Sequence, residues 1–388
     1  MGNKLFILMQ KHKVVLVICI VWLMIQFTLF HFLGVAYGSD STRYIDAANH
    51  LVHERVIPQG MASAYMGYNL FVAIIYSFDL GDSEVVFVQV VLVLISALCL
   101  YHITFSLCKN RLAAFCSAIL YLCLLDIHTW DFYILTDSFF SSMTIISLYL
   151  ILRFKNFYQL FYVIPIVLWT AFIRPTGFVL LISLIIYGAL YLWNNKRYGI
   201  LLLLIGLSVL SAPISFHVVD SMANKMGVVD TFLKGEIIWG YSEKSVSVPQ
   251  NIQINNYFER NSLFEILLFV KNNFIFVIKL AGMKLFYFLL HVKPFYSNAH
   301  NLLIVISYFP IYVFAGIGFL SKIDFSKKVL IMSYLLGQTI IVMLTFEDWD
   351  GRFLSAIMPL VIIFAAIGLR EYLYHFDKIK LVQKSVLS

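Results

Sequence analysis

Residues 14–36 read VVLVICIVWLMIQFTLFHFLGVA, an apolar run without a single Asp, Glu, Lys or Arg. A helix of this length crosses a hydrocarbon core about 30 Å thick, and it bonds its backbone polar groups internally, as lipid requires. The run is also longer than the apolar core of a cleaved signal peptide. We therefore expect an uncleaved first span, with Lys4, Lys11 and Lys13 on the cytoplasmic side.

Similar runs recur along the 388-residue chain, of which 61% is hydrophobic and 13% charged. A soluble domain carries about 25% charged residues. The composition predicts an all-α polytopic membrane protein with about ten transmembrane helices, forming a single transmembrane domain over residues 1–388. The expected spans are 14–36, 83–106, 111–127, 133–153, 157–173, 176–193, 199–219, 301–320, 328–346 and 353–370.

The basic residues show how these spans are oriented. Most Lys and Arg sit in short turns, which the positive-inside rule places in the cytoplasm together with both chain termini. This distribution accounts for the net charge of +7 and argues against nucleic-acid binding. We expect a multi-pass protein of the cell membrane, in a bacterial inner membrane. The turns are 109–111, 153–155, 195–197 and 326–328, followed by the tail after residue 370.

Two apolar segments, 64–80 and 263–291, are not counted as spans. Counting either one would move the later basic turns to the outer side, against the same rule. We expect interfacial helices instead, one in each of the outer loops 37–82 and 220–300. The second segment also carries charges that lipid disfavours, namely Glu265, Lys271, Lys279 and Lys284.

Asp40 follows the first span in a stretch that reads GSDSTRYIDAANHL from residue 38. The pattern predicts a short interfacial helix that begins at Ser39 or Asp40. One interpretation is that Asp40 only caps this helix and complements its dipole. The other is that its carboxylate does chemistry at the membrane surface.

Asp137 lies near the outer end of an expected span, between Leu135 and Phe139, where an unpaired carboxylate is costly. It is either a functional acid or a structural partner for a nearby Arg. Asp126, His128 and Asp131 crowd the preceding turn, but their spacing is not diagnostic of a metal site.

Arg174 interrupts an apolar stretch as part of Arg174-Pro175-Thr176-Gly177. Pro and Gly open the backbone there, and a guanidinium is well suited to a phosphate or pyrophosphate. The alternative is an interfacial Arg whose charged end reaches water beside a helix-ending turn.

Two later outer turns are rich in polar and aromatic residues. Residues 291–301 include Lys293, Tyr296 and His300, and residues 347–353 place three acids beside Arg352. A solvated loop is the plainer interpretation of each. Under the expected topology, however, Asp40, Asp137, Arg174, Lys293 and Arg352 reach one membrane face, where basic groups can hold a lipid phosphate while a carboxylate deprotonates a hydroxyl.

The chain resembles the polytopic type C (GT-C) glycosyltransferases, of the dolichyl-phosphate-mannose protein mannosyltransferase and aminoarabinose transferase kind. The resemblance rests on four short motifs in the family's order. The family usually has two adjacent acids after the first span, and here Ser41 replaces the second, so that its role passes to Asp46 or Asp137. The motifs are Asp40-Ser41-Thr42-Arg43-Tyr44 with Ala47-Ala48, Leu135-Thr136-Asp137-Ser138, Arg174-Pro175-Thr176-Gly177, and Asp350-Gly351-Arg352-Phe353 before Pro359.

The resemblance implies an inverting transfer of a sugar from a polyprenyl-phosphate donor to a glycan, lipid or protein acceptor on the outer side. It implies that Asp40 is the general base and that Asp137 orients the acceptor or sugar, or helps to hold a divalent cation such as Mg²⁺ or Mn²⁺. Arg174 would contact the donor phosphate. The further expected substrate contacts are Arg43, Tyr44, Lys293, Tyr296, His300 and Arg352, of which Lys293 and Arg352 would stabilise the leaving group.

Two other function classes stay open. A lipid-linked sugar flippase or small-molecule transporter requires ionisable residues near the middle of the membrane and a path across it. A scaffold protein of an envelope complex would leave the acids without a task. The gathering of polar residues at one face favours the enzyme.

Overall fold

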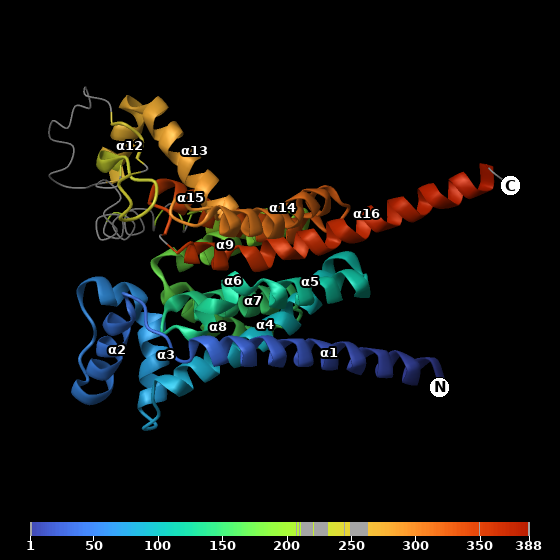
Figure 1. Ribbon diagram of the computed structural model, residues 1–388, viewed down its shortest axis with the longest axis horizontal. Coiled ribbons are helices and arrows are strands. Elements are labelled where there is room, and N and C mark those ends of the chain that lie inside the picture. The colour runs from blue at the N-terminus through green and yellow to red at the C-terminus, as the bar shows by residue number, and fades with distance from the viewer. Residues whose placement is uncertain are drawn as a thin grey trace. The chain divides into compact units, whose positions relative to one another are not determined.

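A computed structural model of the protein describes residues 2–206, 208, 210, 220, 232–243, 245–248, 263–348 and 350–386 (Figure 1). Within these ranges the regular elements are all helices, and β-type pairing is confined to isolated bridges. The expected all-α class is therefore confirmed for the described residues. Most of the second half of the expected span 199–219, and residues 221–231 and 249–262 of the outer loop 220–300, lie outside them.

The chain divides into two compact units, which interleave in sequence. Unit 1 comprises Met1–Leu181, Phe309–Lys328 and Ser355–Ser388, and unit 2 comprises Ile182–Tyr308 and Val329–Leu354. Three long helices, α9, α14 and α15, have residues in both units.

The first half of the chain supplies most of unit 1. Its α-helices are α1 (Gly2–Leu33), α2 (Ser41–Asn49), α3 (Met66–Tyr76), α4 (Asp82–Cys108), α5 (Arg111–Cys123), α6 (Leu125–His128), α7 (Thr136–Leu152) and α8 (Leu160–Ile173). Between them lie the short turns η1 (His50–Glu54), η2 (Gly60–Tyr65), η3 (Thr129–Phe132), η4 (Phe157–Gln159) and η5 (Pro175–Gly177).

The second half carries fewer described helices. They are α9 (Phe178–Asn194), α12 (Leu263–Asn272), α13 (Phe274–Leu290), α14 (Asn298–Leu320), α15 (Phe325–Leu344) and α16 (Met358–Val386), with the turn η6 (Arg352–Ala356) before α16.

Six described helices are long and apolar enough to cross a membrane, as expected of a multi-pass protein. They coincide with the predicted spans 14–36, 83–106, 176–193, 301–320, 328–346 and 353–370. Their bounds are Lys13–Leu33, Asp82–Cys108, Pro175–Asn194, Asn298–Leu320, Phe325–Leu344 and Met358–His375.

The described helices do not give the ten crossings that the sequence suggests. The span expected at 111–127 is two helices that bend by 61°, because Leu124 leaves the helical conformation. It adds a seventh crossing only if the bent pair is one span. The spans expected at 133–153 and 157–173 are the shorter apolar helices Thr136–Leu152 and Phe157–Ile173. The first has 17 residues and extends about 25 Å, less than a typical hydrocarbon core.

The two apolar segments left out of the span count form short helices. The segment 64–80 gives α3, whose 11 residues extend about 16 Å, too little to cross a bilayer. The segment 263–291 gives α12 and α13, which break at Asn273. Lys284 of α13 is fully buried and donates to the backbone oxygen of Thr345, with its ammonium 4.7 Å from the Phe232 ring. Its ammonium group therefore has a polar and an aromatic partner within unit 2.

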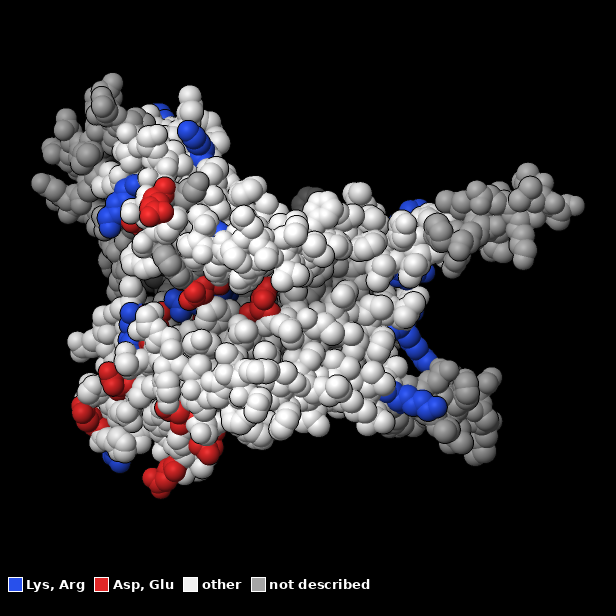
Figure 2. Space-filling view, in the orientation of Figure 1, with Lys and Arg blue, Asp and Glu red and all other residues white. Residues whose placement is uncertain are grey.

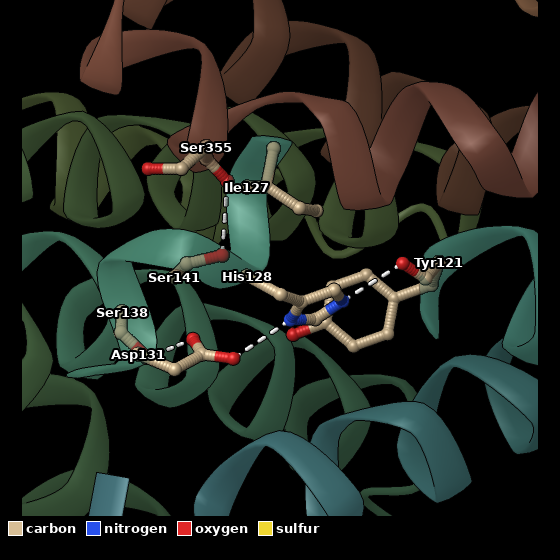
Figure 3. Close-up of a pocket in the computed structure, with 7 residues that line it drawn as sticks. All are labelled: Tyr121, Ile127, His128, Asp131, Ser138, Ser141 and Ser355. Carbon is tan, nitrogen blue, oxygen red and sulfur yellow. Dashed lines mark hydrogen bonds and ion pairs between the residues drawn. The ribbon is translucent and has the colours of Figure 1, made fainter. Parts of the chain in front are cut away.

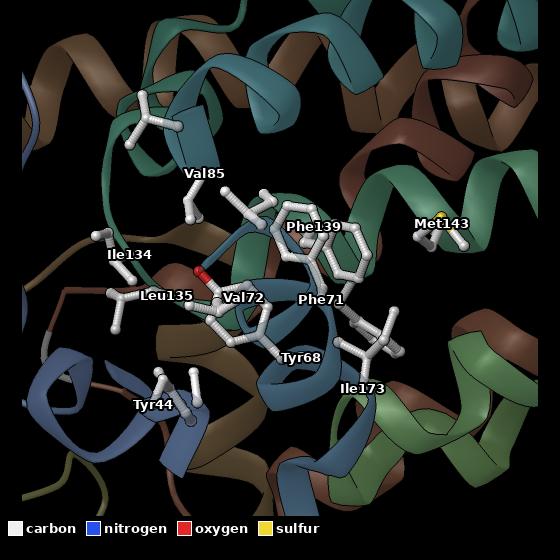
Figure 4. Packing of buried hydrophobic residues seen from close by; sticks show 14 of the residues in the cluster. Tyr44, Tyr68, Phe71, Val72, Val85, Ile134, Leu135, Phe139, Met143 and Ile173 are labelled. Atoms are coloured by element: carbon white, nitrogen blue, oxygen red, sulfur yellow. The ribbon is translucent and has the colours of Figure 1, made fainter. Parts of the chain in front are cut away.

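The core of unit 1 forms where α4 packs against α5 and α7, and α7 packs against α8. At one end of these helices, α2 and α3 pack on each other and close the core with aromatic side chains (Figure 4). The Phe71 and Phe139 rings stack 4.0 Å apart, and Tyr68 meets both Tyr44 and Phe139. This packing joins α2, which follows Asp40, to α7, which carries Asp137 in its first turn.

Charged side chains of unit 1 are distributed unevenly over its surface. Figure 2 shows acidic atoms gathered over the end that carries α2 and α3, while the flanks of the long helices are nearly free of charge. Exposed apolar side chains such as Phe27 (72% exposed) and Phe161 (88%) cover those flanks. A surface of this kind suits a lipid environment.

Candidate functional site

Two chain segments that are about a hundred residues apart in sequence are joined by backbone hydrogen bonds. The Ala36 N–H donates to the Phe132 oxygen over 2.9 Å, and the Ile134 N–H donates to the Ala36 oxygen over 3.1 Å. The Ser41 hydroxyl adds a bond of 2.9 Å to the Ile134 oxygen. The segment that leads to Asp40 therefore adjoins the segment that leads to Asp137.

Asp40 stands immediately before α2. It makes no side-chain capping hydrogen bond, so the interpretation that it serves only as a helix cap is not supported. Its Oδ1 lies 3.1 Å from Nη2 of Arg43, and its side chain is 20% exposed. The carboxylate is thus steadied by a neighbouring cation and is still accessible to solvent.

Asp137 is buried in the first turn of α7 and is paired with Arg174. The Arg174 guanidinium donates from Nη1 to Oδ1 of Asp137 over 2.5 Å, with side-chain exposures of 10% and 1%. The guanidinium also lies 5.8 Å from the centre of the Phe140 ring. Oδ2 of Asp137 is buried without a hydrogen-bond partner. Of the interpretations drawn from sequence, the ion pair with an Arg is the one observed, and it leaves one carboxylate oxygen unused.

A tight turn places Arg174. Pro175 begins η5, and the Gly177 N–H donates to the Arg174 oxygen over 2.9 Å. A Cβ atom at Gly177 would overlap the backbone of Ala171, so the turn packs against the preceding helix as only glycine allows. The Arg-Pro-Thr-Gly motif is thus the local cause of the guanidinium's position.

Nearby charged groups affect the pKa of the Tyr44 hydroxyl. Its ring is buried, and it meets the Tyr65 and Tyr68 rings edge-on at 5.3 and 5.1 Å. Burial raises the pKa of Tyr44 far above its usual range, and the carboxylates of Asp40 and Asp137 raise it further, while Arg174 lowers it. The three charged groups therefore lie close enough to one hydroxyl to act on it together.

Ser41 occupies the position where the resembled family has a second acid. Its side chain is fully buried, accepts from the Gly38 N–H over 2.8 Å and donates to the Ile134 oxygen. A carboxylate there would face a carbonyl oxygen away from water, which is unfavourable. Asp46, one candidate for the displaced role, is exposed on the other face of α2, whereas Asp137 is buried beside Arg174.

Unit 2 contains a second polar cluster, which includes two of the predicted residues. Lys293 is buried and donates from Nζ to Oε1 of Glu347 over 2.8 Å and to the Asp348 oxygen over 2.7 Å. Arg352 lies with Nε 3.3 Å from Oδ1 of Asp348. Both predicted cations are thus engaged with acids of the same loop.

Both the backbone and the side chain of Glu347 make hydrogen bonds. Its backbone bridges to Ile238, with bonds between its own N–H and the Ile237 oxygen and between the Trp239 N–H and its oxygen. Burial raises the pKa of Glu347 to about 7, although Lys293 acts in the opposite direction. Oε2 of Glu347 has no hydrogen-bond partner. The sequence showed these acids only as members of an outer turn.

The remaining predicted contacts of unit 2 lie near this cluster. The Tyr296 and His300 rings are stacked 4.4 Å apart and nearly parallel, and His300 is exposed. His291 ends α13 in the left-handed conformation with φ of 57°, and its buried ring rests against Gly351. Burial lowers the pKa of His291 to about 3, and the nearby charge of Lys293 acts in the same direction.

The turn that carries Asp126, His128 and Asp131 forms a buried network rather than an open ligand set (Figure 3). Nδ1 of His128 lies 2.8 Å from Oδ2 of Asp131, and its Nε2 lies 2.8 Å from the Tyr121 oxygen. The Ser138 hydroxyl donates to Oδ1 of Asp131 over 2.5 Å. These groups line a small pocket with Ser141 and Ser355. Both nitrogens of His128 already have oxygen partners.

The described residues do not fit a divalent cation. They include no group of three or more His, Cys, Asp or Glu side chains arranged to hold one. At the site in unit 1, Asp137 is paired with Arg174 and Asp40 with Arg43, so each carboxylate already has a cationic neighbour. The Mg²⁺ or Mn²⁺ implied by the resemblance therefore has no ligand set among the described residues.

No protein-family model matches this chain, and no curated protein matches it.

Proposed function

We propose that the protein is a membrane glycosyltransferase that moves a sugar from a polyprenyl-phosphate donor to an acceptor on the outer side of the membrane, with inversion. The observation that carries the proposal is the backbone pairing of residue 36 with residues 132–134. It brings the segment of Asp40 beside the segment of Asp137, next to the Arg174 guanidinium. Two carboxylates and a cation at one membrane interface suit acid–base chemistry on a phosphate-linked substrate.

In this proposal Asp40 is the general base. Its carboxylate takes the proton of an acceptor hydroxyl, whose oxygen then attacks the anomeric carbon of the sugar. The bond from that carbon to the phosphate oxygen breaks, and the polyprenyl phosphate leaves with the bonding electrons. The partial exposure of Asp40 and its position 3.1 Å from the Arg43 guanidinium support this role.

Asp137 and Arg174 are proposed to bind rather than to transfer protons. Oδ2 of Asp137 lacks a partner in its buried position, and a sugar or acceptor hydroxyl would satisfy it. A guanidinium has five N–H donors, so Arg174 can hold Asp137 and a phosphate oxygen at once. Tyr44 would line the same site. In unit 2, Lys293 and Arg352 remain the residues proposed to stabilise the leaving group, and Tyr296 and His300 remain proposed substrate contacts.

The proposed setting is a bacterial inner membrane, with about ten crossings, both termini in the cytoplasm and residues 37–63 outside. Single cysteines at the exposed residues Ser39 and Asp46, in a chain without its five native cysteines, would react with a membrane-impermeant reagent added from outside to intact cells. Labelling only after the cells are opened would overturn this orientation.

The decisive experiment supplies the purified protein with a panel of polyprenyl-phosphate sugars and measures sugar transfer or hydrolysis. Asp40→Asn should lower the rate by about 10²–10⁴-fold, the usual contribution of a general base. Asp46→Asn is the matched control, because Asp46 lies in α2, the helix that follows Asp40, and its side chain is exposed. Release of no sugar from any donor, or full activity of Asp40→Asn, would contradict the proposal.

One observation favours a second candidate, a flippase or small-molecule transporter. The His128–Asp131 pair is ionisable and buried in the bent helix pair that is a candidate crossing. Such a pair is typical of proton-linked transport. The test is substrate flipping by the protein in liposomes. If transport occurs and Asp131→Asn abolishes it while Asp40→Asn does not, the transporter is the better account.

A further inference from the structure

Gln89 is a polar residue in an otherwise apolar part of α4, two turns after the helix begins at Asp82. The surrounding residues from Val85 to Leu94 are otherwise all apolar, and the Gln89 side chain is fully buried. Burying an amide without partners costs free energy, so a glutamine at such a place needs hydrogen bonds.

The Gln89 amide makes three hydrogen bonds to two different parts of unit 1. Its Oε1 accepts from the Tyr68 hydroxyl over 2.9 Å. Its Nε2 donates to the Asp131 oxygen over 3.0 Å and to the Tyr133 oxygen over 2.9 Å. The orientation of the amide is fixed, because two carbonyl oxygens require its NH₂ group and its oxygen then faces the hydroxyl.

One side of this junction supports the helix that follows Asp40. The Tyr68 ring, held by Gln89, meets the Tyr44 ring edge-on with centres 5.1 Å apart. Tyr44 lies one helical turn after Asp40 in α2. Gln89 therefore acts on the Asp40 segment through two packed aromatic rings (Figure 4 labels both tyrosines).

The other side holds the chain that leads to Asp137. Gln89 binds the carbonyl groups at residues 131 and 133, and Ala36 binds Phe132 and Ile134 from the opposite strand of the bridge. Four consecutive residues before α7 are thus fixed from two sides. The position of Asp137 in the first turn of α7 depends on that loop.

From this geometry we infer that Gln89 is a positioning residue that sets the spacing between the Asp40 and Asp137 segments. The inference rests on the proposed function for its effect on activity, but the spacing itself can be measured without activity. Replacement by Leu removes all three hydrogen bonds, so the buried Asp131 oxygen and Tyr68 hydroxyl lose their Gln89 partner, while the Tyr133 oxygen still accepts from the Leu135 N–H. Tyr68→Phe removes one bond and leaves the bonds to the loop in place.

The first measurement follows the spacing. Cysteines at positions 36 and 133 report whether the bridge is intact, since bridged residues lie within the range of Cα separations that a disulfide needs. They are placed in the full chain after its five native cysteines are replaced. We expect Gln89→Leu to lose cross-link yield under mild oxidation. Gln338→Leu, which removes a buried glutamine of α15, should not.

The second measurement follows sugar transfer by the same variants without the added cysteines. We expect Gln89→Leu to lower kcat by about 100-fold, as a displacement near 1 Å can, while the KM for the lipid donor changes little. Tyr68→Phe should lie between wild type and Gln89→Leu in both measurements, and it serves as the test if Gln89→Leu fails to fold.

The outcomes separate the two ideas. If the wild type transfers no sugar from any donor, the proposed function fails, and the cross-linking comparison still decides the spacing. If Gln89→Leu and Tyr68→Phe keep the wild-type cross-link yield, or lose it without any change in kcat, Gln89 is not a positioning residue.

Discussion

Arg174 donates to the buried carboxylate of Asp137 over 2.5 Å, and so ties the turn after α8 to the first turn of α7. The two residues are 37 positions apart in sequence, and both side chains are almost inaccessible to water. Each charge is tolerated in the apolar interior because the other is present.

Removing either partner should therefore destabilise the protein. Asp137→Asn or Arg174→Met leaves an uncompensated buried group, at a cost of about 3–5 kcal/mol. The double variant should be less destabilised than the sum of the two, because it removes both charges. Thermal unfolding in detergent measures this. Arg43→Met is the control, because its pair with Asp40 is partly exposed and should contribute at most about 1 kcal/mol. Additive effects of Asp137→Asn and Arg174→Met would show that the pair is not coupled.

His291 should make the protein less stable in acid. Burial lowers its pKa to about 3, below the ordinary value of 6.5 that it regains on unfolding. Between these pH values the histidine is protonated in the unfolded chain but not in the native protein. The free energy of unfolding therefore falls as the pH drops below about 6.5. The pKa of Glu347 is raised to about 7, and its titration changes the free energy of unfolding in the opposite direction. The pH dependence of the wild type by itself therefore does not isolate the histidine.

The comparison with His291→Asn isolates the histidine. Asn tolerates the left-handed backbone at this position and does not titrate. The difference in unfolding free energy between wild type and His291→Asn should shrink by about 1.4 kcal/mol for each pH unit below 6.5. A difference that stays constant from pH 7.5 to pH 5 would show that the ring is protonated as readily in the folded state.

Gly351→Ala should be costly for two reasons. The glycine has φ of 69°, and an added Cβ would overlap the His291 ring. The backbone conformation alone costs about 1–2 kcal/mol for a residue with a side chain. Gly240→Ala separates the two causes, because Gly240 has φ of 72° but no neighbouring atom within 4 Å of its Cβ position. We expect Gly351→Ala to lower the unfolding temperature more than Gly240→Ala does. Equal decreases would show that the contact with His291 does not contribute to the cost of Gly351→Ala.

The sequence predicted membrane helices and individual charged residues better than it predicted partners. Asp137 and Arg174 stood out because each is a charge in apolar surroundings, and the structure pairs them. Lys293 stood out as a cation, but its partner Glu347 is 54 residues away, and no local pattern connects them. Gln89 was not predicted at all, since its role depends on three groups brought together only by folding.

The helix count failed for a related reason. Hydropathy measures how apolar a run is, but not whether its backbone stays straight, and the run at 111–127 bends after Cys123. The segment 263–291 forms two separate helices, α12 and α13, and its Lys284 is buried among partners in unit 2. Local composition thus limits which segments can cross a membrane, whereas tertiary contacts determine which partners each charged side chain has.

A close crossing of α14 and α16 in unit 1 gives the sharpest test of the helix packing. Gly318 and Gly368 face each other there, and a Cβ added at either one would overlap the backbone oxygen of Phe364 or of Phe314. Small residues at such a crossing let two membrane helices approach closely.

Gly318→Ala and Gly368→Ala should each force the helices apart and cost about 1–3 kcal/mol. Gly316→Ala, two residues away on α14, meets no atom within 4 Å and should gain up to about 1 kcal/mol from its higher helix propensity. The unfolding temperature in detergent should therefore fall for the first two variants and hold or rise for the third. Equal shifts for all three would mean that the two glycines do not lie at a helix contact.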